Sequence, residues 1–208
     1  LVDHQEYKEL SAAVAQLGPW VISDEIYHGL TYAGREHSIL EYTDRAFVLN
    51  GFSKAFAMTG WRLGYLIAPS PFIRPLQKAF QNFFISTNEF VQWAGVAALR
   101  EASGEVVRFR QIFDERRRAM LAGLREVGLG VGYEPAGAFY VLANARRYTQ
   151  KSFDFAFEIL ERAHVGVTPG IAFGPNAEGY LRFSYANSLE RILEGLRRLG
   201  QFLGSLGS

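Results

Sequence analysis

The sequence predicts an α/β protein in two parts, a partial sheet domain over residues 1–108 and a smaller α+β domain over residues 109–208. Short, continuously apolar runs alternate with stretches whose apolar residues recur at helical spacing, a pattern typical of this class. The composition, 49% hydrophobic with a net charge of +1, supplies a core and excludes disorder. The pattern turns helical from Phe72 to about Val127, and we expect the boundary inside the last helix of that tract, near residue 108.

The first helix is expected to begin after Asp3, which forms a D-x-x-E capping pattern with Glu6, and to end at Gly18-Pro19. Its apolar positions at helical spacing are Tyr7, Leu10, Val14 and Leu17. Strands are expected next at Trp20–Asp24, Ala46–Asn50 and Trp61–Ala68. Because these runs are apolar throughout, they favour a sheet that is covered on both faces.

The second part is expected to alternate helices and strands. The expected elements are a helix from Glu105 to Val127, a strand over Ala138–Ala143, a helix over Ser152–His164, a strand over Tyr180–Tyr185 and a helix from about Ser188.

The residue inventory excludes several classes of protein. With 22 basic and 21 acidic residues the chain has no overall field that favours nucleic acid or an acidic membrane surface, so neither is expected as a partner. The absence of cysteine excludes disulfides and thiolate metal sites, and it fits a reducing compartment such as the cytoplasm. No metal site is expected. No apolar run approaches the roughly 18–20 residues that a membrane span requires.

The stretch Gly51–Gly64 (GFSKAFAMTGWRLG) carries the strongest chemical signal. Lys54 follows the end of an apolar strand, and a lysine amine becomes a nucleophile toward an aldehyde when burial or a nearby cation lowers its pKa. Ser53 and Arg62 together offer a hydroxyl and a guanidinium fork, which suit a phosphate. The alternative is a solvated lysine and an arginine that caps a strand.

A second candidate site lies thirty residues before Lys54, at Asp24 and Tyr27. Asp24 stands at the carboxyl end of a predicted strand, where open α/β sheets bind ligands. The two side chains converge only if the strand ends near Asp24. The alternative makes Asp24 a cap and Tyr27 a core residue. Glu25 and His28 are expected to face solvent.

Arg182 is the third candidate. Strand alternation places it on one face with Tyr180 and Ser184. An arginine among apolar neighbours requires an anion, and a substrate carboxylate matches its fork. The alternative is an internal ion pair with a glutamate.

The stretch around Lys54 resembles, at all fourteen positions, the cofactor-lysine motif of class I/II pyridoxal-phosphate (PLP) aminotransferases. The resemblance implies the C-terminal part of the PLP-dependent transferase fold type I. It implies that Lys54 binds PLP covalently and moves the proton in catalysis, and that Ser53 and Arg62 hold the phosphate. Asp24 would be the buried carboxylate that keeps the PLP ring nitrogen protonated, and Tyr27 would bind the ring oxygen.

Residues 182–186 also match this family's R-x-S-x-A segment, which implies that Arg182 binds the substrate α-carboxylate. The implied activity moves an amino group between an amino acid and a 2-oxo acid, in a cytoplasmic homodimer. A C–S β-lyase of the same fold and a non-catalytic remnant are the alternatives.

The resemblance covers only the second half of the family's fold. It implies that a glycine-rich phosphate loop, an aromatic ring that stacks on PLP and an asparagine lie upstream. Residues 1–208 alone are therefore expected to be inactive. It also implies that the first three strands are neighbours at one end of a larger sheet, with the third antiparallel.

Overall fold

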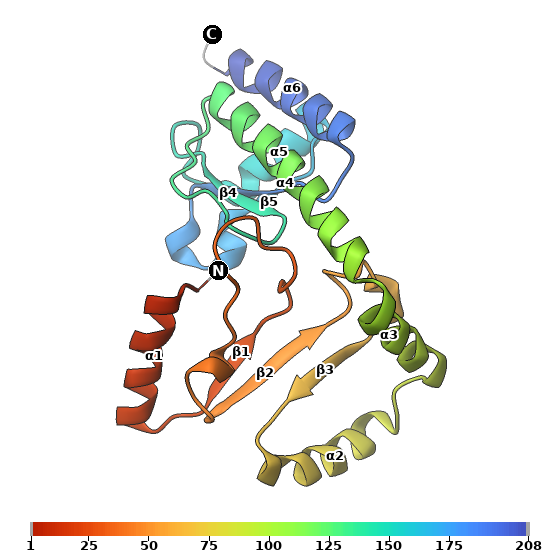
Figure 1. Cartoon of the computed structure of the whole chain (residues 1–208). Helices are drawn as coiled ribbons and strands as arrows, with labels where there is room; N and C mark the ends of the chain where they lie inside the picture. The colour runs from red at the N-terminus through yellow and green to blue at the C-terminus, as the bar shows by residue number, and fades with distance from the viewer. Residues whose placement is uncertain (1, 207–208) are drawn as a thin grey trace. The chain divides into compact units, whose positions relative to one another are not determined.

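The computed structural model describes residues 2–206, which form two compact units that divide between Arg110 and Gln111 (Figure 1). The division lies inside helix α4, and each unit contains its own three-stranded sheet. In the described part of the chain, every helix is either too short or too polar to cross a lipid bilayer.

The helices are α1 (His4–Leu17), α2 (Ser70–Phe84), α3 (Glu89–Glu101), α4 (Ser103–Glu126), α5 (Ser152–Ala163) and α6 (Leu189–Ser205). The strands are β1 (Val21–Asp24), β2 (Ala46–Gly51), β3 (Gly64–Ile67), β4 (Tyr140–Asn144), β5 (Thr168–Pro169) and β6 (Tyr180–Ser184). Short 3₁₀ turns lie at Ile39–Glu41, Thr59–Trp61, Gly170–Phe173 and Pro175–Ala177.

Helix α1 has the ends that its sequence predicts. The Asp3 carboxylate accepts the Glu6 backbone N–H, and the Glu6 carboxylate accepts the Asp3 N–H, so the capping box is complete. Gly18 closes the helix in the left-handed conformation, with φ 73°. Tyr7 and Val14 lie on the face of the helix that packs against the core, and both are buried.

The sheet of the first unit has the order β1-β2-β3, with β1 and β2 parallel and β3 antiparallel to β2. The expected neighbourhood and the expected antiparallel third strand are confirmed. One face packs against α1 and the 3₁₀ turn at residues 39–41 through a cluster that consists of Tyr7, Ile39, Ala46 and Val48. On β2, Phe47 alternates with Ala46 and Val48, and its ring packs edge-on against Phe72 at the start of α2.

The expectation that both faces of this sheet are covered is wrong for the described residues. All four residues of β3 are exposed, and Ile22 in β1 is 71% exposed. Strand β3 is also shorter than predicted, because Thr59–Trp61 form a 3₁₀ turn and Arg62 is left-handed with φ 54°. A left-handed residue cannot continue an extended strand, so β3 begins only at Gly64.

The helical tract after β3 consists of three helices. The first break follows Ile85, whose φ of 65° is rare for a β-branched residue. The second lies at Ala102, between α3 and α4. Glycine permits close packing of α3, since a Cβ on Gly95 would lie 2.6 Å from the Leu63 side chain.

In the second unit β6 lies between β4 and β5, antiparallel to both. Its alternation is as predicted, with Leu181, Phe183 and Tyr185 buried. These residues belong to a core with apolar residues of α4, α5 and α6, among them Leu124, Ile159, Leu199 and Phe202. Strand β4 begins at Tyr140 rather than Ala138, because Ala138 has a φ of 60°.

Candidate functional site at the carboxyl edge of the first sheet

The carboxyl ends of β1 and β2 bring two turns together. Asp24 is the last residue of β1, as the convergence of Asp24 and Tyr27 requires, and it pairs with Leu49 of β2. The two turns then touch. A Cβ on Gly29 in the first turn would lie 3.1 Å from Ala55 Cβ in the second, so a larger residue would push them apart.

Lys54 and Tyr27 meet at this contact. Lys54 Nζ lies over the Tyr27 ring, 5.8 Å from its centroid, and both residues are half-buried. Phe52, which is 5% exposed, and the half-buried Phe56 pack together in the same turn, with their rings tilted and their centroids 5.4 Å apart. The lysine amine therefore extends from apolar surroundings toward the Tyr27 phenol ring.

Asp24 is exposed, and this corrects the expectation of a buried carboxylate. Its Oδ1 accepts the Ile26 backbone N–H at 3.2 Å, which turns the chain sharply after β1. The buried carboxylate belongs to its neighbour Glu25. Strand alternation explains the difference, because residue 24 lies on the uncovered face with Ile22 and residue 25 lies on the core face.

Ser53 and Arg62 come from the two ends of the loop between β2 and β3. The pairing of Gly51 with Gly64 closes the loop, and Phe52 N–H donates to the Leu63 carbonyl at 3.2 Å, so residues 53 and 62 follow at corresponding positions. Arg62 is exposed and left-handed, and its Nη1 donates to the Thr59 carbonyl at 3.0 Å. Left-handed residues other than glycine are strained, and such strain is common at functional sites.

Arg182 occupies the central strand of the second unit, between Leu142 of β4 and Thr168 of β5. Its guanidinium carbon lies 4.2 Å from the Tyr140 ring centroid and 4.8 Å from that of Phe173. Nη2 donates to Thr168 Oγ1 at 3.2 Å, whereas Nε is buried with no hydrogen-bond partner within residues 2–206.

The alternative of an internal ion pair for Arg182 is not observed, since no described carboxylate lies within 4.0 Å of its guanidinium. Arg182 lines a cavity of about 550 Å³ together with Gly137, Ala138, Tyr140 and Phe173. A buried N–H without an acceptor is costly, so the arrangement suits an external anion.

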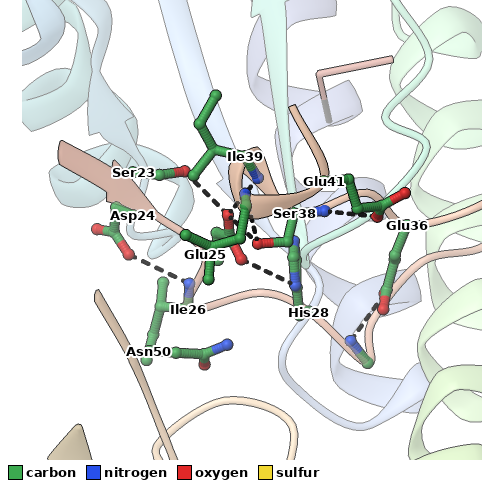
Figure 2. A network of polar contacts seen from close by, with 12 residues as sticks. Ser23, Asp24, Glu25, Ile26, His28, Glu36, Ser38, Ile39, Glu41 and Asn50 are labelled. Atoms are coloured by element: carbon green, nitrogen blue, oxygen red, sulfur yellow. Dashed lines mark hydrogen bonds and ion pairs between the residues drawn. The ribbon is translucent and has the colours of Figure 1, made fainter. Parts of the chain in front are cut away.

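Glu25 is the residue that the sequence analysis missed, and the expectation that it faces solvent is wrong. It is 5% exposed, and its Oε1 accepts hydrogen bonds from Ser23 Oγ, Ser38 Oγ and the Ile39 N–H (Figure 2). His28, also expected to face solvent, is half-buried, with Nδ1 3.5 Å from Glu25 Oε2. Alternation along β1 was the available signal, because residues 21, 23 and 25 share the core face.

The buried carboxylate affects its surroundings. Partial desolvation of its hydroxyl raises the pKa of Tyr65, although 43% of the residue is exposed, and the Glu25 carboxylate raises this pKa further. Burial also raises the pKa of Tyr7; a hydrogen bond with Ser23 opposes this shift, and Glu25 adds to it. Within the described residues, no three His, Asp or Glu side chains gather in a group that could hold a metal ion.

Comparison with known proteins places the chain in a family. Residues 1–199 match the family described as "Aminotransferase class I and II". The "(5-formylfuran-3-yl)methyl phosphate transaminase" of Methanocaldococcus jannaschii is 41% identical over 189 residues, which cover 89% of this chain and 50% of the relative. The "Aspartate aminotransferase" of Pyrococcus horikoshii is 38% identical over 205 residues, with 94% and 52% covered.

Solved structures agree with this match. The aromatic aminotransferase of Pyrococcus horikoshii superposes with a TM-score of 0.94 at 36% identity, over 99% of this chain and 56% of that protein. The chain thus spans about half the length of the relatives it matches. It belongs to the class I and II aminotransferases, and its fold is the corresponding part of theirs.

Proposed function

We propose that the protein carrying this chain transfers an amino group between an amino acid and a 2-oxo acid, with PLP as its cofactor. The observation that carries the proposal is the position of the Lys54 amine over the Tyr27 ring, where Asp24 ends the neighbouring parallel strand. Ligands bind at this edge of open α/β sheets. An amine, a phenol and a carboxylate at one edge are the groups that a pyridine aldehyde requires.

The side chains present fit PLP by their chemistry. Ser53 offers a hydroxyl, and Arg62 has further N–H groups beyond the one that it donates to Thr59. The two together suit a phosphate. The exposed Asp24 carboxylate has one oxygen bonded to Ile26 and the other available to a ring N–H. Lys54 would hold the aldehyde carbon through its amine.

The residues then have separate tasks. Bound PLP would supply a sink for the electrons left behind when the α-carbon of the substrate loses a proton. Lys54 Nζ would remove and return that proton as general base and acid. The Asp24 carboxylate would hold a proton on the ring nitrogen, the Tyr27 hydroxyl would bind the ring oxygen, and the buried Phe52 would exclude water.

Arg182 would bind the substrate α-carboxylate. Its unpartnered Nε supports this role, because a carboxylate supplies the acceptor that the described chain lacks. The guanidinium lies over the Tyr140 and Phe173 rings, and these cation–π contacts help to fix its orientation. We propose a homodimer and a cytoplasmic location from family membership alone.

The proposal is tested with the protein as its gene encodes it. Borohydride reduction in the presence of PLP, followed by peptide mass mapping, should place the cofactor on Lys54. Amino acids supplied with a 2-oxo acid should then yield a newly aminated acceptor. Modification of other lysines only, or pyruvate and ammonia from a cysteine-type substrate with no aminated acceptor, would contradict the proposal and in the second case favour a β-lyase.

A further inference from the structure

We propose that Glu25 is a positioning residue, which fixes Asp24 and Tyr27 for the cofactor by tying their turn to the 3₁₀ turn at residues 39–41. This inference rests on the proposed function of Asp24 and Tyr27. The Glu25 carboxylate contacts Ser23, Ser38, Ile39 and His28, so its effect on Asp24 and Tyr27 has to pass through the turn that they share.

The contacts of the Glu25 side chain cross a long stretch of sequence. Its Oε1 accepts Ser23 Oγ at 3.1 Å within β1, and then Ser38 Oγ at 3.1 Å and the Ile39 N–H at 3.0 Å. Figure 2 shows Glu25 at the centre of these donors, with the Asp24 carboxylate turned toward Ile26. Three hydrogen bonds to one buried oxygen leave the side chain little freedom.

The main chain of Glu25 is held as firmly. Its N–H donates to the Leu49 carbonyl of β2 at 2.9 Å, and its carbonyl accepts the His28 N–H at 3.0 Å. Asp24 precedes this anchored residue, and Tyr27 lies within the turn that the His28 bond closes. Asp24 and Tyr27 therefore lie beside a residue whose main chain is fixed to β2, and the contacts that a substitution at position 25 removes are those of its side chain.

The same turn reaches the lysine. A Cβ on Gly29 would lie 3.1 Å from the Cβ of Ala55, the residue after Lys54, and a Cβ on Gly51 would lie 3.3 Å from the Ile26 side chain. A turn that moved by a few tenths of an ångström would move Tyr27 relative to Lys54. Glu25 thus links a core segment to the geometry of the candidate cofactor site.

A purely structural role is the competing explanation, and a matched control separates the two. Glu41 also accepts a hydrogen bond in the segment at residue 38, from the Ser38 N–H at 3.0 Å. Its other contacts are with His37 and Arg35, which lie outside the turn after β1. Glu41→Ala should lower the thermal midpoint and leave PLP binding unchanged. Glu25→Gln retains a carbonyl oxygen for Ser23, Ser38 and Ile39, and should bind PLP nearly as the natural protein does.

The experiment uses the protein as its gene encodes it, titrated with PLP well below the melting temperature of each variant. Glu25→Ala should weaken PLP binding about tenfold or more, as expected for lost hydrogen bonds to a buried oxygen. It should also shift the pH midpoint of the bound cofactor's absorbance and speed amide hydrogen exchange in residues 26–30. Exchange in this segment is a readout that needs no cofactor.

An unchanged PLP dissociation constant and pH midpoint in folded Glu25→Ala would overturn the inference and leave the proposed function intact. If Glu25→Ala does not fold, Ser23→Ala and Ser38→Ala test the inference instead. Each removes one donor to Glu25 Oε1, and both should shift the pH midpoint of the bound cofactor's absorbance in the same direction. Unchanged midpoints in both would overturn the inference. A natural protein that shows no PLP-dependent absorbance would overturn the proposed function, and the inference with it.

Discussion

The Lys54 amine lies over the Tyr27 ring, with Nζ 5.8 Å from the centroid. The two residues come from different turns, one after β1 and one after β2, and they are neighbours because those strands are parallel and adjacent. Twenty-six residues of chain separate them, including the segment at 38–39 that Glu25 ties back to the sheet. The relationship is therefore tertiary, although each residue belongs to a local motif.

Replacement of Lys54 by alanine in the protein as its gene encodes it should abolish the absorbance of covalently bound PLP and the amino-group transfer. The reason is that Lys54 supplies the amine that lies over the Tyr27 ring at the carboxyl edge of the sheet. Lys8→Ala, which changes an exposed lysine of α1, is the control and should leave both unchanged. Retained absorbance and turnover in Lys54→Ala would rule out the assignment.

Replacement of Arg182 by alanine should weaken carboxylate substrates far more than PLP. A charged hydrogen-bonded pair in a partly dry site is typically worth about 2–5 kcal/mol when one partner is removed. Arg182→Lys should bind substrate nearly as poorly, because an ammonium lacks the planar fork.

Arg146 provides the matched control for Arg182. Its guanidinium also lies over an aromatic ring, that of Tyr180 at 4.9 Å, but it is exposed and donates to the Glu178 carbonyl. Steady-state kinetics of both variants separate the roles. If Arg182→Ala loses thermal stability while its Michaelis constant is unchanged, Arg182 is structural.

Gly170→Ala should destabilise the second unit. A Cβ at this position would lie 2.0 Å from the Ala177 carbonyl oxygen and 2.6 Å from that of Tyr180, and backbone atoms cannot yield as a flexible side chain does. Overpacking of this kind typically costs about 1–3 kcal/mol. Gly166→Ala is the control, since its Cβ would meet no atom within 4 Å. The denaturant midpoint of Gly170→Ala should therefore lie below that of Gly166→Ala. Equal midpoints would show that the segment from Gly170 to Tyr180 is less tightly packed than these distances indicate.

Glu194 should titrate far below an ordinary glutamate. Hydrogen bonds from Arg197 and then Arg198 lower the pKa of its carboxyl from 4.5 to about 2. Because the folded pKa is depressed, this interaction stabilises the protein above the unfolded pKa, and the stabilisation is lost as the pH falls toward the folded value. A carboxyl-carbon NMR titration should show the midpoint of about 2.

The same shift predicts how a Glu194 variant responds to acid. The free energy of unfolding of the natural chain should exceed that of Glu194→Gln by its largest amount at pH 7. This difference should become smaller as the pH falls from 4.5 toward about 2. Glu161→Gln, an exposed change in α5, is the control variant. A Glu194 midpoint near 4.5 would contradict the paired geometry.

Residues 1–208 produced alone should bind PLP weakly and catalyse no transfer. The chain spans about half of its relatives, and Asp24 and Arg62 are both exposed in it. Phosphate sites usually depend on backbone donors at a helix N-terminus, and side chains alone replace them poorly. Titration of the purified chain with PLP, followed by absorbance, measures this directly. Stoichiometric micromolar binding with turnover would show that these residues contain more of the site than we expect.

The sequence by itself determined the features that depend on neighbouring residues. The capping box of α1, the end of β1 at Asp24, and the alternation of β6 around Arg182 all follow from short-range hydrogen bonds and from the two-residue period of a strand. The motif around Lys54 could also be identified from the sequence, because its members lie within fourteen residues.

Only the tertiary structure decided which side chains are buried and which are exposed. Glu25 is buried because Ser38 and Ile39, thirteen and fourteen residues away, fold back over it. Asp24 and β3 are exposed because no described segment covers their face. Burial depends on which distant segments pack together, and the local spacing of residues does not predict which segments these are. The convergence of Lys54 and Tyr27 has the same origin, since strand pairing, rather than either motif, brings the two turns into contact.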